Sequence, residues 1–275
     1  MKTLMDVQEL QDRMTSGAQL ILLDVRWALG DPHGHENYRA AHIPGAVYVD
    51  LQTQLCAPGG PGLGRHPLPH TDALQEAARQ WGLDDDSTVV AYDDSGNLAA
   101  ARLWWLLRDA GFDSVSLLDG GLTAWRAAGF EVEGGEEQHC VGSVTLSCGH
   151  MPVVAVPDLL DDATVDVLLD ARAGERFRGE QEPVDPKAGH IPGAVSAPTM
   201  ENLGRDRRFR PAAELRRRFG ALGADRGRVA VYCGSGITAA HEIAALDIAG
   251  ISASLFPGSW SQWSTTEGLP VATGA

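Results

Sequence analysis

The sequence predicts an α/β protein of two tandem domains, each a parallel sheet flanked by helices. Short apolar runs rich in valine and leucine, without polar alternation, are typical of strands buried on both faces. Amphipathic segments of helical length stand between these runs, and strand–helix alternation favours parallel sheets. The pattern occurs twice within 275 residues, a length that suits two ordinary domains.

Four segments of the first half recur in the same order in the second half. LILLDVR (20–26) returns as DVLLDAR (166–172), AHIPGAV (41–47) as GHIPGAV (189–195), TVVAYDDSG (88–96) as RVAVYCGSG (228–236), and LLDGGLTAW (117–125) as LFPGSWSQW (255–263). The spacing between copies changes only by loop-sized amounts, which indicates an internal duplication.

The same series of elements is expected in each copy. Strands are predicted over 20–24, 88–92 and 115–118, then over 167–170, 228–232 and 253–256. Helices are predicted over 71–82, where Thr71 is placed as N-cap and Gly82 as the stop, and over 211–223, where Pro211 stands in the first turn. Two more helices, over 98–111 and 237–250, follow the strands that end in tyrosine.

A polar, glycine-containing stretch separates the copies. Residues 134–150, GGEEQHCVGSVTLSCGH, match neither copy and are interpreted as a linker. The sequence therefore predicts an N-terminal domain over 1–133 and a C-terminal domain over 151–275.

Composition excludes several classes of function. The net charge of −15 argues against nucleic acid or an anionic membrane as a partner, because both favour basic surfaces. No apolar run approaches the roughly 18 residues that span a bilayer, and the N-terminus lacks the apolar core of a signal peptide. A soluble cytoplasmic protein is expected. The four cysteines (Cys56, Cys140, Cys148 and Cys233) lack zinc-binding spacing, so neither a metal nor a cofactor is expected.

Cys233 stands where a predicted parallel strand ends and a helix begins. Ligands bind at the carboxyl ends of strands in such sheets. Gly234 and Gly236 let the chain curl tightly, so that several N–H groups point at one spot and form an anion cradle. The loop therefore favours a nucleophilic thiolate. A buried structural cysteine is the alternative, but the first copy has Asp93 at this place, so the fold does not need a cysteine there.

These motifs together resemble the rhodanese superfamily of two-domain sulfurtransferases. The shared features are LLDVR and LLDAR, HIPGA twice, and one CGSGITA loop, and they cover nearly the whole chain. The resemblance implies that Cys233 takes sulfur from a small anionic donor, forms a persulfide, and passes the sulfur to cyanide or to a thiol such as thioredoxin or glutathione. It also implies a catalytically silent N-terminal domain that helps to shape the cleft.

Within the superfamily, the loop resembles that of the 3-mercaptopyruvate sulfurtransferases. Thiosulfate-type relatives carry two basic residues after the cysteine, where this chain has Gly234 and Ser235. The loop Cys-Gly-Ser-Gly-Val-Thr of the mercaptopyruvate branch is matched with Ile237 in place of valine. The resemblance assigns substrate contacts to Gly234, Gly236, Ile237 and Thr238, and a catalytic hydrogen bond to Ser235. Ser235 could equally cap the next helix, and the two roles do not exclude each other.

Further site residues follow from the same resemblance. Arg176 matches an arginine that grips the substrate carboxylate, for which a guanidinium is well shaped; a solvated surface arginine is the alternative. His66 matches a catalytic histidine facing the cleft from the first domain, and Arg65 beside it is a candidate for substrate binding. His42 and His190 are interpreted as structural, because both copies contain one.

The chain departs from the branch where a second substrate arginine is expected, about nine positions after Arg176. That neighbourhood reads Pro183-Val184-Asp185. Arg178, Lys187 or Arg65 could supply the missing charge. The branch also has an aspartate two residues past the Asp50 position, where this chain has Gln52.

Two other functions are consistent with the sequence, and a third is excluded. Thiosulfate sulfurtransfer by the same persulfide chemistry is the main alternative, and a non-enzymatic persulfide carrier or binding module is the second. The related phosphatase chemistry needs a Cys-x5-Arg loop. It is excluded because the sixth residue after Cys233 is Ala239.

Overall fold

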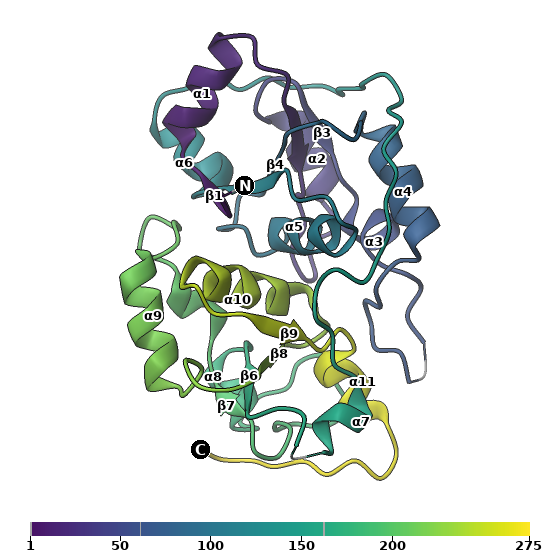
Figure 1. The fold of residues 1–275 in the computed structure, drawn as a ribbon, viewed down its shortest axis with the longest axis vertical. Helices are drawn as coiled ribbons and strands as arrows, with labels where there is room; N and C mark the ends of the chain where they lie inside the picture. Colours follow the sequence, from purple (N-terminus) through teal and green to yellow (C-terminus); the bar gives the residue numbers. More distant parts are fainter. Residues whose placement is uncertain (1, 61, 162) are drawn as a thin grey trace. The chain divides into compact units, whose positions relative to one another are not determined.

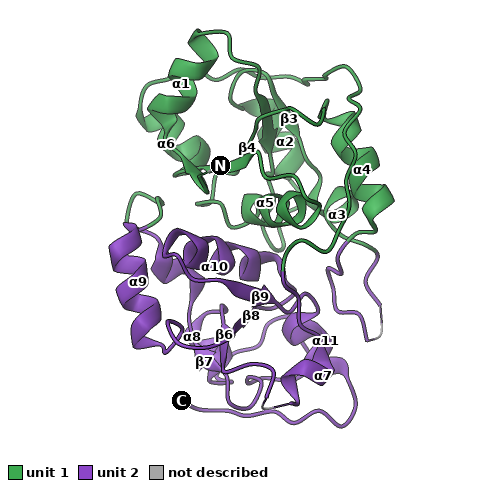
Figure 2. Cartoon of the chain, in the orientation of Figure 1, with its two compact units in different colours: residues 1–57, 69–151, 205–209 green, residues 58–68, 152–204, 210–275 purple. Residues whose placement is uncertain are grey.

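The computed structural model describes residues 2–60, 62–161 and 163–275, and divides the chain into two compact units. Figure 2 colours them separately. Unit 1 comprises Met1–Ala57, Pro69–Met151 and Arg205–Phe209, and unit 2 comprises Pro58–Leu68, Pro152–Gly204 and Arg210–Ala275. Each unit thus takes a short segment from the other repeat. Residues 134–150 group with unit 1 and form neither helix nor strand.

Unit 1 is built on a parallel five-stranded sheet with the order β1-β5-β4-β2-β3. Its strands are β1 (Leu4–Met5), β2 (Ile21–Asp24), β3 (Ala46–Tyr48), β4 (Val89–Tyr92) and β5 (Val115–Leu118). Figure 1 shows α1 (Val7–Thr15) and α6 (Gly121–Ala127) on one side of the sheet, with α3 (Leu51–Gln54), α4 (Thr71–Gln80) and α5 (Ala100–Asp109) on the other. Helix α2 (Gly34–Ala40) leads into β3.

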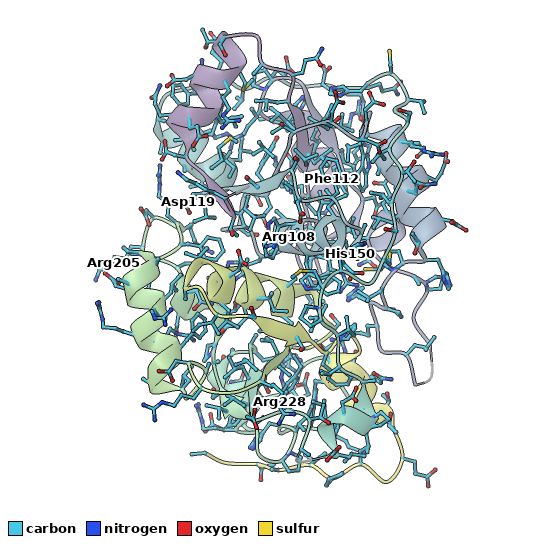
Figure 3. All side chains as sticks on the ribbon, viewed as in Figure 1. Arg108, Phe112, Asp119, His150, Arg205 and Arg228 are labelled. Atoms are coloured by element: carbon cyan, nitrogen blue, oxygen red, sulfur yellow. The ribbon has the colours of Figure 1, made fainter. Side chains whose placement is uncertain are left out.

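Unit 2 repeats this plan with a parallel four-stranded sheet of order β7-β6-β8-β9. Its strands are β6 (Val167–Asp170), β7 (Val195–Ser196), β8 (Val229–Tyr232) and β9 (Ala253–Leu255). Helices α7 (Val156–Leu159) and α11 (Ser259–Thr265) cover one face, and α9 (Ala212–Ala221) and α10 (Ile237–Ile248) the other (Figure 1). The short helices α8 (Gly174–Phe177) and η1 (Thr199–Asn202) follow β6 and β7. Arg228, labelled in Figure 3, joins the starts of β6 and β8 through a 3.0 Å ion pair with Asp166.

The predicted α/β class with two parallel sheets is confirmed, because all six predicted strands form within a residue of the expected bounds. Their apolar residues are buried on both faces; Val90 and Ala91, for example, are both fully buried although they point to opposite sides. Three details differ from expectation. Thr71 is the first residue of α4, and His70 is its N-cap. Pro211 is the N-cap of α9, which begins at Ala212. The edge strand β1 has no strand counterpart among the described residues of unit 2, where Val153 makes only an isolated bridge to Leu255.

None of the helices within the described ranges combines the length and the hydropathy that crossing a bilayer requires.

Candidate active site

The Cys233 loop connects β8 to α10 in unit 2. Gly236 adopts a φ of +83°, a left-handed conformation that glycine takes without a steric penalty, and α10 begins at the next residue. This turn brings the Gly236 N–H to 3.1 Å from Cys233 Sγ. The cysteine is only 2 % exposed. A main-chain donor aimed at the sulfur, at the start of a twelve-residue helix, favours negative charge on that atom.

Ser259, at the start of α11, is hydrogen-bonded to the Cys233 loop. Its hydroxyl accepts the Cys233 N–H at 3.1 Å and donates to the Phe256 carbonyl at 2.9 Å. It is fully buried and has a φ of +52°, which is uncommon for a residue with a side chain. Sequence reasoning missed Ser259. Only a comparison of the two repeats could have indicated it, because glycine stands at the matching position of the first repeat. That residue, Gly121, has a similar φ of +54° but no hydroxyl.

The matching loop of unit 1 is filled by its own carboxylate. Asp93 accepts main-chain hydrogen bonds from four residues at 2.7 to 3.2 Å: Ser95, Asn97, Ala99 and Ala100. Burial raises the pKa of the Asp93 carboxyl, while these four N–H groups oppose the shift. The loop of unit 1 is therefore an anion cradle. In unit 1 a fixed aspartate occupies it, and in unit 2 the corresponding side chain is Cys233.

Ser235 and His66 form a hydrogen-bonded pair beside the cysteine. Ser235 Oγ lies 2.7 Å from His66 Nδ1, and both side chains are buried. Although His66 comes from the first repeat in sequence, residues 58–68 belong to unit 2, so the pair forms within one unit. Arg65, the residue before His66, is also anchored in unit 2, because its N–H donates to Ser261 Oγ at 3.0 Å.

Two guanidinium groups flank the loop at Gly234. A β-carbon placed on this glycine would lie 3.2 Å from Arg65 Nη2 and 3.5 Å from Arg176 Nη1. Arg65 therefore lies beside Arg176 at the loop. Arg178 does not join them, because it is exposed and pairs with Glu180 at 2.7 Å.

Two nearly buried carboxylates hold these arginines in place. Glu182 accepts from Arg176 Nη2 at 2.7 Å and from Nε at 3.2 Å, and Asp185 pairs with both Arg65 and Arg176. Burial acts to raise the pKa of Glu182, but the hydrogen bonds from Arg176 and two main-chain N–H groups outweigh it, so the pKa lies below its usual value. Burial raises the pKa of Asp185, and this effect exceeds the lowering caused by the positive charge of Arg65. The sequence did not predict either carboxylate as a site residue.

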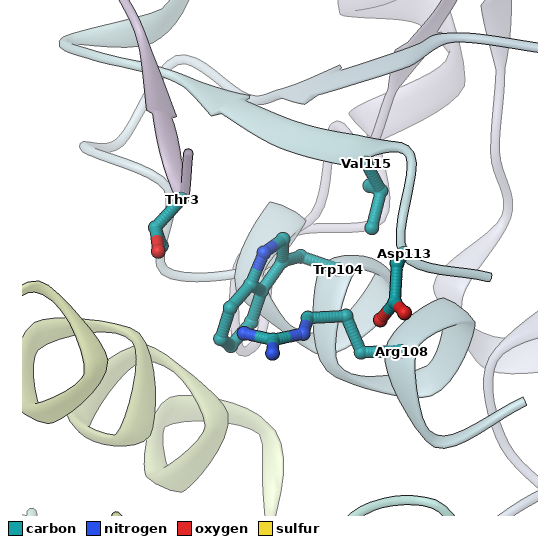
Figure 4. Close-up of a pocket in the computed structure, with 5 residues that line it drawn as sticks. All are labelled: Thr3, Trp104, Arg108, Asp113 and Val115. Carbon is teal, nitrogen blue, oxygen red and sulfur yellow. The ribbon is translucent and has the colours of Figure 1, made fainter. Parts of the chain in front are cut away.

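A cavity of about 690 Å³ opens on this cluster, and Arg65, His66 and Asp185 are among its lining residues. Ile237 and Thr238 form the first turn of α10, where Ile237 is buried and Thr238 half-buried. Unit 1 has a smaller cavity of about 220 Å³ between β1, α5 and β5, in which Arg108 lies over the Trp104 ring at 5.1 Å (Figure 4). Its lining contains neither cysteine nor histidine.

The two HIPGA histidines share a packing role. His42 Nδ1 lies 3.0 Å from the Tyr38 carbonyl and its ring stacks on Tyr38 at 4.2 Å. His190 repeats this arrangement with Phe177, at 2.8 Å and 3.7 Å. Both rings therefore anchor the loop after a short helix, in agreement with the structural role that the sequence predicts.

Comparison with known proteins places this geometry in context. The model of the rhodanese-like domain matches residues 6–128 and 154–266. A Pseudomonas aeruginosa protein, named provisionally as a 3-mercaptopyruvate sulfurtransferase, is 46% identical over 98% of both chains. A Mycobacterium tuberculosis protein, named provisionally as thiosulfate sulfurtransferase SseB, is 44% identical over 99% of this chain and 98% of its own. The crystal structure of the 3-mercaptopyruvate sulfurtransferase SseA from Escherichia coli superposes with a TM-score of 0.83 at 29% identity, covering 95% of this chain and all of that one.

Proposed function

Because this chain belongs to the rhodanese-like domain family, we propose that it is a sulfurtransferase that carries sulfur as a persulfide on Cys233. Family membership confirms the resemblance drawn from the HIPGA and CGSGITA motifs. One observation supports the assignment of the chemistry above all: the Cys233 sulfur receives the Gly236 N–H at 3.1 Å in a loop whose duplicate holds a carboxylate. Unit 1, with Asp93 at that place, is proposed to be catalytically silent.

The preferred donor in this proposal is 3-mercaptopyruvate. The Cys233 thiolate attacks the sulfur of the donor and forms the S–S bond, while the carbon–sulfur bond breaks. Its electron pair passes into the adjacent carbonyl and gives the enolate of pyruvate, which then takes up a proton. The sulfur stays on the enzyme as a persulfide. The Gly236 N–H stabilises the attacking thiolate in the resting loop.

Ser235 is proposed to stabilise the enolate oxygen. A serine hydroxyl has one proton, so Ser235 can donate it to the substrate only if its oxygen accepts a hydrogen bond from His66. The 2.7 Å contact to His66 Nδ1 provides that bond when this nitrogen carries the proton. A hydrogen bond that strengthens as charge develops lowers the barrier more than it strengthens ground-state binding.

Arg65 and Arg176 are proposed to bind the donor's carboxylate. Each directs one Nη group toward Gly234, which places two donors side by side at the loop. The pairs with Asp185 and Glu182 fix the orientation of the guanidinium groups, and a rigid pair loses less entropy when it binds an anion. Gly234, Gly236, Ile237 and Thr238 would form the wall of the pocket.

The charges around the loop favour a monocarboxylate over thiosulfate. Arg65 and Arg176 are matched by Asp185 and Glu182, so the cluster has little net positive charge to neutralise a dianion. No basic residue follows Cys233 within the loop. Thiosulfate remains the second candidate donor, because one relative at 44% identity carries that name.

In the second half-reaction a thiolate attacks the outer sulfur of the persulfide. The new S–S bond forms on the acceptor, the bond to Cys233 breaks, and the enzyme thiolate is regenerated. A thiol such as glutathione or thioredoxin fits this step. Cyanide can attack the same sulfur through its carbon, in which case a C–S bond forms, thiocyanate leaves, and the bond to Cys233 breaks in the same way. The cavity of about 690 Å³ beside His66 is large enough for a small thiol or for the tip of a protein loop.

The donor assignment is tested by comparing kcat/KM for 3-mercaptopyruvate and thiosulfate under the same acceptor. The proposal expects mercaptopyruvate to be the better donor. A preference for thiosulfate would make thiosulfate the donor and would leave the persulfide mechanism unchanged. Absence of turnover with both donors, with a persulfide still formed on Cys233, would instead identify a carrier protein.

A further inference from the structure

The packing role of His42 leaves its second ring nitrogen without a partner. The Tyr38 carbonyl can only accept, so His42 Nδ1 carries the proton that bonds to it at 3.0 Å. In the neutral ring Nε2 is then left with a lone pair. Nε2 has no hydrogen-bond partner among the described residues, and the His42 side chain is fully buried. A buried polar atom of this kind needs a ligand or a proton to offset the cost of its desolvation.

Two carboxylates converge on that nitrogen. Glu133 Oε1 lies 3.6 Å from His42 Nε2, too far for a hydrogen bond. One ligand atom each from His42, Glu133 and Glu137 lie within 4.8 Å of one another. Glu133 is fixed opposite the histidine by a pair of main-chain hydrogen bonds of 2.9 and 3.0 Å, and the Glu137 N–H donates to Tyr38 Oη at 3.1 Å.

The second repeat shows that packing does not require these acids. His190 makes the same Nδ1 contact with a main-chain carbonyl and the same two-stranded bridge, but its partner in the bridge is Ala272. The histidine therefore keeps its structural place without a carboxylate at the position of Glu133. The glutamates are an addition in unit 1. Glu133 Oε1 accepts the Gly45 N–H at 2.5 Å and lies 3.6 Å from the free nitrogen.

We propose that His42, Glu133 and Glu137 form a binding site for a divalent transition-metal ion, with Zn²⁺ as the best fit. An imidazole with two carboxylates matches the nitrogen and oxygen ligands that zinc accepts, whereas Mg²⁺ and Ca²⁺ prefer oxygen alone. Zinc holds such atoms at about 2.0 to 2.2 Å, which puts neighbouring ligand atoms roughly 3.3 to 3.5 Å apart in a tetrahedron. The 3.6 Å separation of Nε2 and Oε1 is close to that value.

The surroundings of the site are those of a metal-binding histidine. Ligating imidazoles commonly donate their other N–H to a carbonyl, which fixes the tautomer and the ring, as Tyr38 does for His42. Three protein ligands leave a fourth position for water. The ion would tie the segment that begins at Glu133 to the loop after α2, and would relieve the repulsion between two glutamates in a chain of net charge −15.

The test is a titration of the full-length protein with Co²⁺, a spectroscopic stand-in for zinc. Cys140 and Cys148 are exposed thiols that could bind the metal, so both are replaced by serine in every variant. The proposal predicts one Co²⁺ per chain, displaced by Zn²⁺, with ligand-field bands but no thiolate-to-cobalt charge-transfer band. Zinc should also raise the melting temperature, because a ligand that binds only the native state stabilises it.

Glu137→Gln should weaken binding by at least about tenfold, since even outer-shell changes cost 10- to 100-fold. Glu136→Gln is the matched control, because Glu136 pairs instead with His35 and Arg39. Glu133→Gln serves as a second variant in case Glu137→Gln fails to fold. Equal affinity in wild type, Glu137→Gln and Glu133→Gln would overturn the proposal, as would a charge-transfer band. Absence of one-to-one binding would overturn it too.

Discussion

Ser235 Oγ lies 2.7 Å from His66 Nδ1, although the two residues are 169 positions apart in the sequence. The contact joins the loop that carries Cys233 to a segment of the first repeat that packs within unit 2. In the proposed mechanism His66 orients Ser235 and supports its hydrogen bond to substrate, so the two residues should act as a unit.

Ser235→Ala should therefore lower kcat for 3-mercaptopyruvate by about 10² to 10³, the usual effect of removing one donor to a developing oxyanion. Thiosulfate turnover should fall less, because its leaving group does not form an enolate. In a double-mutant cycle, His66→Ala should add little in the Ser235→Ala background, since residues that act as a unit are not additive. His70→Ala, at the exposed start of α4, is the control. Independent, additive losses would show that the two residues act separately.

Gly234→Ala should raise KM for mercaptopyruvate with a smaller effect on kcat. The added methyl group would lie 3.2 Å from Arg65 Nη2 and 3.5 Å from Arg176 Nη1, in the space that the donor's carboxylate would use. Gly220→Ala is a matched control in α9, where the nearest atom would be 3.6 Å away. Steady-state kinetics separate the two parameters. An unchanged KM in Gly234→Ala would place the carboxylate elsewhere.

Asp185→Asn should improve the use of thiosulfate by about tenfold in kcat/KM, equivalent to about 1.4 kcal/mol. The change removes one negative charge beside Arg65 and Arg176 and nearly preserves the side-chain shape. Glu180→Gln is the control, because Glu180 pairs with the exposed Arg178. If the ratio of thiosulfate to mercaptopyruvate activity does not change, Asp185 does not set donor preference.

The same carboxylate gives a pH dependence. Burial raises the pKa of Asp185, so it takes up a proton at a higher pH than an ordinary aspartate. Protonation removes its negative charge, and the affinity of the site for anions should then increase as the pH falls toward that pKa. The thiosulfate-to-mercaptopyruvate ratio in the wild type should rise over this range and stay flat in Asp185→Asn. Parallel profiles in the two proteins would contradict the assignment.

Asp93→Ala should destabilise unit 1 by about 2 to 4 kcal/mol, because several buried N–H groups lose a charged acceptor. Asp94→Ala, at the next and exposed position, should change the free energy of unfolding by less than about 1 kcal/mol. Urea unfolding monitored by circular dichroism measures both. A neutral Asp93→Ala would mean that the loop does not need an anion.

The sequence predicts the sheets well because parallel strands buried on both faces read as unbroken apolar runs, and each run occurs twice. The difference between Asp93 and Cys233 can likewise be found by aligning the two repeats. The side-chain partners of the site could not be predicted in this way. Arg65, Arg178 and Lys187 were equivalent candidates for the missing charge, because loops have no periodicity that fixes where a side chain points.

The acidic residues of the site were missed for a related reason. Asp185 stands where the resemblance led us to expect an arginine, and its pairing with Arg65 spans 120 positions. Such an ion pair depends on which loops pack together in the fold, so it cannot be predicted from local sequence patterns. Ser259 could be noticed in the sequence only because the matching residue of the first repeat is Gly121. The two residues share a backbone conformation with positive φ.

Mass spectrometry can locate the transferred sulfur, which we expect on Cys233. The full-length protein is treated with 3-mercaptopyruvate without an acceptor, alkylated, and digested under non-reducing conditions. The peptide that contains Cys233 should gain the mass of one sulfur atom and lose it when a thiol is added, and Cys233→Ser should be inactive. Sulfur found instead on Cys56, Cys140 or Cys148, with Cys233→Ser still active, would show that Cys233 is not the sulfur carrier.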